Sequence, residues 1–283
     1  MSKTIQNQPI GIFDSGVGGL TVYRALHERL PNERFVYLGD TARVPYGTKS
    51  LATVERYAIE NSLFLASRGI KILVVACNTA SALALPKIRA AVGIDVVGVI
   101  GPGARKAAKL AKNKIGVIAT EATVSSHAYK KAIEKISPRI KVIETSCPLF
   151  VPLAEEGWTN EPETRSIAKK HLEKILKAKV EALVLGCTHY PILRDVIADT
   201  VGKNVILIDS GEACAEETAV LLAEKNLASA ETKRKKTRRL GDDLDHFYVT
   251  DAAERFARVA ERFLGAKPAK LEAVEVFGAD ELF

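Results

Sequence analysis

Short runs of apolar residues alternate along most of this chain with longer segments in which apolar positions recur every three or four residues. The short runs predict β-strands at residues 10–13, 35–38, 72–76, 96–100, 115–119, 142–145, 182–185 and 205–208. The segments between them, such as residues 51–68, have the spacing of amphipathic helices. Strands that alternate with helices predict an α/β fold with mainly parallel sheets.

The strand pattern contains a repeat. Residues 10–13 resemble 115–118 at an offset of 105, and 99–103 resemble 207–211 at an offset of 108. The apolar runs that end in Cys77 and Cys187 are offset by 110. Three matches in one order predict two similar halves, each Rossmann-like or flavodoxin-like, with a site in the cleft between them.

The end of the chain has no partner in this repeat. Apolar runs at residues 247–249 and 274–276 predict late strands that complete the first half. We therefore expect a discontinuous first α/β domain at residues 1–98 plus 210–283, and a second α/β domain at residues 99–209.

Composition narrows the class of protein. The chain has 283 residues and is 47% hydrophobic, which is enough for a substantial core and argues against disorder. No apolar stretch approaches the roughly 18 residues that span a bilayer, and residues 1–9 lack an apolar signal-peptide core. We expect a soluble, cytoplasmic protein with no membrane partner.

The net charge of +7 is unevenly distributed, since residues 233–239 carry six positive charges. No aromatic residue interleaves this basic run, and no nucleic-acid-binding motif accompanies it. We expect a solvated loop or helix end, and contact with nucleic acid or an acidic partner stays open as the alternative.

Four cysteines are present, and none has the Cys-x-x-Cys spacing of a zinc or redox site, so no metal is predicted. Cys147 and Cys214 are interpreted as small buried apolar residues. Cys77 and Cys187 differ, because each follows a predicted strand, where parallel sheets place ligands. Two thiols at equivalent edges of two halves could face one ligand from opposite sides.

Polar neighbours strengthen this interpretation. Asn78, Thr79 and Thr188 could donate to a carboxylate, and His189 could serve Cys187 as a base or orienter rather than as a structural histidine. Asp14 opens a glycine-rich turn, residues 14–19, that does not match the dinucleotide-binding fingerprint. A carboxylate there could orient a cation such as a substrate ammonium.

Four segments, at residues 11–20, 39–47, 76–81 and 185–191, together resemble the glutamate racemases, a family of cofactor-independent amino-acid racemases; residues 208–211 are a weaker match. The resemblance implies that Cys77 and Cys187 are two acid/base thiols, with Asp14 and His189 as their helpers. It also implies that Glu155 assists near Cys187, with Glu156 as the alternative. The substrate contacts implied by the resemblance are Asp14, Ser15, Pro45, Tyr46, Gly47, Asn78, Thr79, Thr120, Thr123, Thr188 and His189.

The implied activity is the interconversion of L- and D-glutamate by two bases, which supplies D-glutamate for peptidoglycan and so for cell wall and cell shape. By the resemblance, Cys187 takes the α-proton of L-glutamate and Cys77 that of D-glutamate. No lysine stands in a Schiff-base motif, so no cofactor is implied, and a homodimer is expected. The first alternative is an aspartate or hydantoin racemase. The second is a non-catalytic binding module, and the presence of both cysteines disfavours this second alternative.

Overall fold

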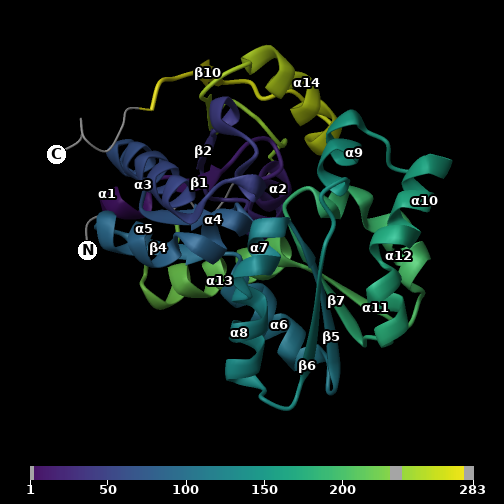
Figure 1. The fold of residues 1–283 in the computed structure, drawn as a ribbon. Coiled ribbons are helices and arrows are strands. Elements are labelled where there is room, and N and C mark those ends of the chain that lie inside the picture. Colours follow the sequence, from purple (N-terminus) through teal and green to yellow (C-terminus); the bar gives the residue numbers. More distant parts are fainter. Residues whose placement is uncertain (1–2, 230–237, 277–283) are drawn as a thin grey trace.

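The computed structural model describes residues 3–229 and 238–276, and within these ranges the chain forms two parallel β-sheets (Figure 1). The first sheet has the order β10-β9-β2-β1-β3-β4 and the second β6-β5-β7-β8. The strands of the first sheet are β1 (Ile10–Asp14), β2 (Phe35–Gly39), β3 (Ile72–Val75), β4 (Asp95–Gly98), β9 (His246–Val249) and β10 (Leu271–Ala273). Those of the second are β5 (Lys114–Ala119), β6 (Lys141–Ser146), β7 (Ala182–Gly186) and β8 (Ile206–Asp209). The expected α/β class is confirmed.

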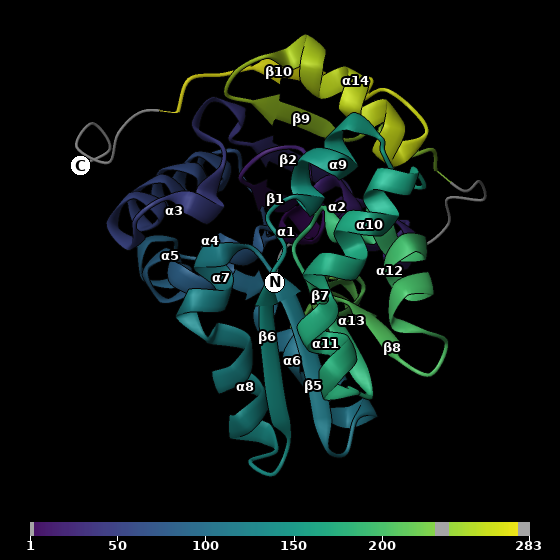
Figure 2. The same cartoon turned by 45° about the vertical axis from the view of Figure 1, so that its right-hand side comes forward.

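Helices cover both sheets, and strands β5, β6 and β7 of the second sheet lie below β1 and β2 of the first in both views (Figures 1 and 2). Helix α13 joins the two layers, because it packs against α2 on one side and α6 on the other. The α-helices are α1 (Lys3–Gln6), α2 (Leu20–Arg29), α3 (Leu51–Ser67), α4 (Asn78–Leu83), α5 (Leu85–Ala91), α6 (Ile100–Leu110), α7 (Glu121–Ser126), α8 (Ala128–Ile136), α9 (Phe150–Glu156), α10 (Pro162–His171), α11 (Glu173–Ala178), α12 (Arg194–Val201), α13 (Ser210–Glu224) and α14 (Ala253–Leu264). Three 3-10 helices are η1 (Thr41–Arg43), η2 (Tyr46–Thr48) and η3 (Tyr190–Leu193).

The central strands are buried on both faces, which explains their continuous apolar sequence. Every residue of β1, β3 and β7 is buried, because helices cover both sides of each sheet. Deleting side-chain atoms from such a strand would open a cavity at a typical cost of about 1–5 kcal/mol, depending on the side chain. This packing fixes the carboxyl ends of the strands, where the polar residues of the site begin.

The two sheets share one strand order, as the sequence repeat predicts. The order β2-β1-β3-β4 in the first sheet matches β6-β5-β7-β8 in the second. Ile10 pairs with Ile72 and Ile115 with Ala182, which reproduces the offsets of 105 and 110. The third predicted offset, 108, is wrong by three residues. Asp95 pairs with Ile72 and Ile206 with Ala182, so β4 and β8 are equivalent at an offset of 111.

Most predicted strands agree with the structure to within one residue at each end, but two do not. The run at 96–100 ends as a strand at Gly98, because Ile100 opens α6 and is buried as a helical residue. The run at 274–276 follows β10, which ends at Ala273; Val274 and Val276 pack against the core without extending the strand. Buried helix ends and loops can be as apolar as a strand, so periodicity alone cannot separate them.

The first sheet takes its strands from residues 10–98 and 246–273, and the second from residues 114–209. The division into domains at 1–98 plus 210–283 and at 99–209 stays a prediction. Across residues 3–229 and 238–276, none of the helices combines the length and apolar character that crossing a bilayer requires.

The basic run is only partly described. Residues 233–237 lie outside the described residues, so their predicted solvation is not tested. Arg238 is buried, which corrects the expectation of a solvated side chain. Its guanidinium forms ion pairs with Asp242 at 2.6 Å and with the buried Asp245 at 2.7 Å. A buried carboxylate needs such a cation, and sequence spacing did not reveal the pairing.

Candidate active site

A cavity lies where segments from the two sheets meet. Its walls come from the turns after β1, β2 and β3 of the first sheet and after β5 and β7 of the second, with α9 closing one side. Carboxyl ends of parallel strands are the usual ligand-binding edge of an α/β sheet. The lining residues are Ser15, Gly16, Val44, Pro45, Tyr46, Gly47, Cys77, Asn78, Thr79, Thr120, Val151, Glu155, Cys187, Thr188 and His189.

Nearly all the predicted site residues line this cavity. Asp14 and Thr123 are the exceptions, since both are fully buried just behind the wall. Gly16 and Val44 also line the cavity. They lie in the motifs at residues 14–19 and 39–47 but were not themselves predicted as site residues. Val151 lines it without any signal in the sequence, because a single apolar residue of α9 looks like an ordinary core position.

Cys77 lies at the N-terminus of α4, and its thiol is held on both sides. Its Sγ donates to Ser15 Oγ at 3.4 Å and accepts from the Ala80 N–H at 3.5 Å. Burial, followed by the charge of nearby Asp14, raises the pKa of Cys77 to about 12. Cys77 therefore carries its proton at neutral pH.

Asp14 lies at the end of β1 behind Cys77. The Gly16 N–H donates to its Oδ2 at 2.9 Å, whereas its buried Oδ1 has no hydrogen-bond partner. Burial raises the pKa of Asp14, against the opposing charge of His189 and the N–H groups of the turn. A buried oxygen without a partner is costly and suits a group that takes and returns a proton.

The second thiol has different partners. Cys187 Sγ lies 3.9 Å from Nδ1 of His189, and His189 Nε2 lies 3.0 Å from Oε1 of Glu155. Burial lowers the pKa of His189, but the hydrogen bonds to Cys187 and Glu155 outweigh it and raise the pKa to about 10. His189 is thus an imidazolium at neutral pH. Glu155 makes this contact, whereas Glu156 is exposed.

The glycine-rich turn of the first sheet touches the second sheet's thiol segment directly. A Cβ added to Gly18 would lie 2.4 Å from both His189 Nδ1 and Thr188 Oγ1. Thr21 Oγ1 donates across the same junction to the Thr188 carbonyl at 2.8 Å. Only a glycine permits this approach, so Gly18 lets the turn pack directly against Thr188 and His189, which follow Cys187.

Hydrogen-bond donors suited to an anionic ligand gather in the cavity wall and directly behind it. The hydroxyls of Thr79 and Thr120 lie 2.9 Å apart, and that of Thr123 lies 3.3 Å and 2.9 Å from them, respectively. Asn78 Oδ1 accepts from the Tyr129 hydroxyl at 2.7 Å, which leaves its buried Nδ2 without a partner. Hydroxyls that can reorient and an unsatisfied amide are available to a carboxylate.

Tyr46 lines the cavity, but its hydroxyl points to the protein rather than to the cavity. That hydroxyl donates to the buried Asp40, which also accepts from Arg43 Nε at 2.8 Å and from Asn61 Nδ2 at 2.9 Å. Tyr46 therefore lines the cavity while its hydroxyl holds the loop in place. Among the described residues, no group of three or more histidine, cysteine and acidic side chains could hold a metal ion.

Comparisons with known proteins cover nearly the whole chain. The model of the Asp/Glu/hydantoin racemase family matches residues 10–218. The glutamate racemase of Geobacter metallireducens is 52% identical over 259 residues, which cover 91% of this chain and 93% of that protein. The structure of glutamate racemase isoform RacE1 from Bacillus anthracis has a TM-score of 0.89 at 36% identity, covering 96% of this chain and 98% of that one.

A second structure includes a ligand. The glutamate racemase from Francisella tularensis, solved in complex with D-glutamate, has a TM-score of 0.86 at 39% identity and covers 96% of this chain and 98% of that one. The family match spans every segment that lines the cavity.

Proposed function

The chain belongs to the Asp/Glu/hydantoin racemase family, and we propose that its cavity interconverts L- and D-glutamate by a two-base mechanism without a cofactor. The observation that carries this proposal is the pair of buried thiols, Cys77 and Cys187, which line one cavity from different sheets. Their partners differ, so each can serve one hand of the substrate.

Inversion at the α-carbon requires proton removal from one face and delivery to the other. With L-glutamate, the Cys187 thiolate takes the α-proton, and the electron pair passes into the α-carboxylate. The Cys77 thiol then delivers its proton to the opposite face and becomes the thiolate. The reverse sequence converts D-glutamate, and exchange with water resets the two thiols.

The neighbouring groups support these steps. The His189 imidazolium lies beside Cys187 Sγ and can orient this sulfur toward the substrate. Asp14 can take the proton of Cys77, since its free oxygen and its raised pKa suit it to a shared proton. Asn78 and the threonine hydroxyls stabilise the negative charge that develops on the substrate carboxylate.

Glutamate is favoured over aspartate and hydantoins by the relatives, of which the structure from Francisella tularensis is a complex with D-glutamate. The test is a racemisation assay with purified protein and no cofactor, across L-glutamate, L-aspartate and a 5-substituted hydantoin. We expect glutamate to be racemised at least about 100-fold faster than the others, since a missing methylene and an altered carboxylate position both weaken binding. Faster turnover of aspartate or hydantoin would reassign the substrate, and no turnover of any would favour a binding module.

Further parts of the proposal concern the setting of this activity. We propose a cytoplasmic homodimer that supplies D-glutamate for peptidoglycan, with domains at residues 1–98 plus 210–283 and 99–209 that close over the substrate. Closure would exclude water from the carbanion. The family membership and the arrangement of the two sheets around one cavity support this picture.

A further inference from the structure

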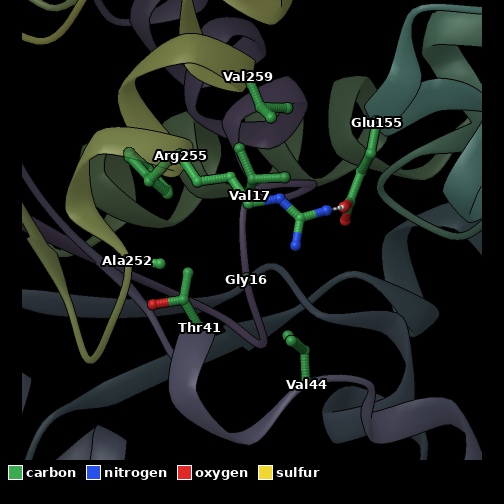
Figure 3. A pocket seen from close by; sticks show the side chains of 9 residues that line it. Gly16, Val17, Thr41, Val44, Glu155, Ala252, Arg255 and Val259 are labelled. Atoms are coloured by element: carbon green, nitrogen blue, oxygen red, sulfur yellow. Dashed lines mark hydrogen bonds and ion pairs between the residues drawn. The ribbon is translucent and has the colours of Figure 1, made fainter.

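Glu155 is held from two sides by groups on different elements. Its Oε1 lies 3.0 Å from Nε2 of His189, and its Oε2 lies 3.2 Å from Nη2 of Arg255. Figure 3 shows the Arg255 side chain reaching from α14 toward the Glu155 carboxylate along a second cavity. Glu155 lines both this cavity and the one with the thiols, as Gly16 and Val44 do.

The same helix also holds the main chain of Glu155. Arg262 lies two helical turns after Arg255 on one face of α14, and its Nη1 donates to the Glu155 carbonyl at 2.7 Å. That carbonyl belongs to the last turn of α9, where helical carbonyls lack intrahelical partners and favour a cation. Helix α14 thus fixes both the backbone position and the carboxylate of Glu155.

This contact joins the two sheets. Helix α14 connects β9 and β10 of the first sheet, whereas α9 follows β6 of the second. Both views place α14 beside α9 (Figures 1 and 2). From Glu155, the chain of contacts continues through His189 to Cys187.

We propose that Arg255 is a positioning residue for the Cys187 side of the reaction: it holds one oxygen of the Glu155 carboxylate so that the other oxygen orients His189. The inference deepens the proposed function and rests on it for the reaction that it names. Without Arg255, the Glu155 side chain could rotate away from His189, because its second oxygen has no other partner among the described residues.

The charges around Glu155 determine what removal of Arg255 does to its titration. The groups that face the carboxylate are His189 and Arg255, with Cys187 beyond His189 and Arg262 on the carbonyl. Burial raises the pKa of Glu155, but its contacts with His189 and the charge of Arg255 outweigh this and lower it. Loss of the Arg255 charge should therefore raise the pKa of Glu155.

The experiment compares Arg255→Gln with Arg255→Lys, and with Arg258→Gln as the matched control. Arg258 lies on the same helix, is exposed, and has no ion pair with any described residue. Because Arg255 is largely exposed, we expect Arg255→Gln to lower kcat/KM only about two- to fivefold and to move the acid limb of its pH profile upward. Arg255→Lys should restore most of the loss, and Arg258→Gln should change neither quantity.

Two further measurements separate positioning from a general structural effect. In a Glu155→Gln background, Arg255→Gln should cause no additional loss, because the group through which it acts is already changed. Carbon-13 NMR of the Glu155 carboxyl should show a raised pKa in Arg255→Gln, and this readout does not depend on turnover. The proposal is overturned if the pKa of Glu155 is unchanged in Arg255→Gln. It is also overturned if Arg255→Gln lowers kcat/KM as much in the Glu155→Gln background as in the wild type. If the wild type does not racemise glutamate while the pKa still rises, the proposed function fails and the link between Arg255 and Glu155 stands.

Discussion

Replacing either Cys77 or Cys187 by alanine is expected to lower racemisation of glutamate in both directions by about 10³- to 10⁴-fold, since each change removes one acid/base group. A single thiol reaches one face of the α-carbon, so the other cannot take over both proton transfers. Enantiomers have equal free energies in water, so kcat/KM must fall equally for L- and D-glutamate. Circular dichroism or chiral chromatography measures both directions.

Cys214→Ala is the matched control for this prediction. Cys214 is a free, fully buried cysteine in α13 that does not line the cavity. Its replacement removes a buried sulfur and should lower the free energy of unfolding by about 1 kcal/mol. It should leave turnover near that of the wild type. Turnover within tenfold of the wild type in Cys77→Ala or Cys187→Ala would exclude the two-thiol scheme.

Asp14→Asn is expected to lower kcat/KM by about 10²-fold while making the protein more stable at neutral pH. The activity falls because an amide cannot take the proton of Cys77. The stability rises because burial raises the pKa of Asp14 above its ordinary value of 3.8. The folded state then binds the proton of Asp14 more tightly than the unfolded chain does. The wild type therefore loses stability as the pH rises from about 3.8 through the raised pKa of Asp14.

Thermal unfolding at acid and neutral pH measures this difference. Asp14→Asn should unfold at a higher temperature than the wild type at neutral pH, and the gap should shrink as the pH falls toward 3.8, where the wild-type carboxyl is also protonated. Asp199→Asn, on the exposed surface, should change neither activity nor stability appreciably. A destabilised Asp14→Asn, or one with full activity, would contradict the assignment of Asp14.

The sequence predicted the fold where local pattern and tertiary packing agree. Buried parallel strands such as β3 and β7 have continuous apolar runs, and the cysteines that follow them mark a ligand-binding edge. The prediction failed at residues 99–100 and 274–276, where apolar side chains enter the core from a helix end and a loop. The buried Arg238 was missed for a related reason, since its partner Asp245 is recognisable only in three dimensions.

The candidate site shows the same division. Local motifs and the family resemblance together predicted Cys77, Cys187 and their adjacent donors, because these residues follow strands directly. Spacing could not assign the hydroxyl of Tyr46 to Asp40, nor could it place Arg255 against Glu155. These contacts join residues on separate elements, and in the second case on helices attached to different sheets.

The central claim is that two thiols exchange protons with the substrate from opposite faces. The most direct measurement is incubation of the purified protein with L-glutamate in heavy water without added cofactor, followed at early times by chiral separation and mass spectrometry. We expect D-glutamate with one deuterium at the α-carbon, because the delivering thiol has exchanged with solvent, while the remaining L-glutamate keeps its α-hydrogen. D-glutamate that keeps the original hydrogen, or no D-glutamate at all, would contradict the claim.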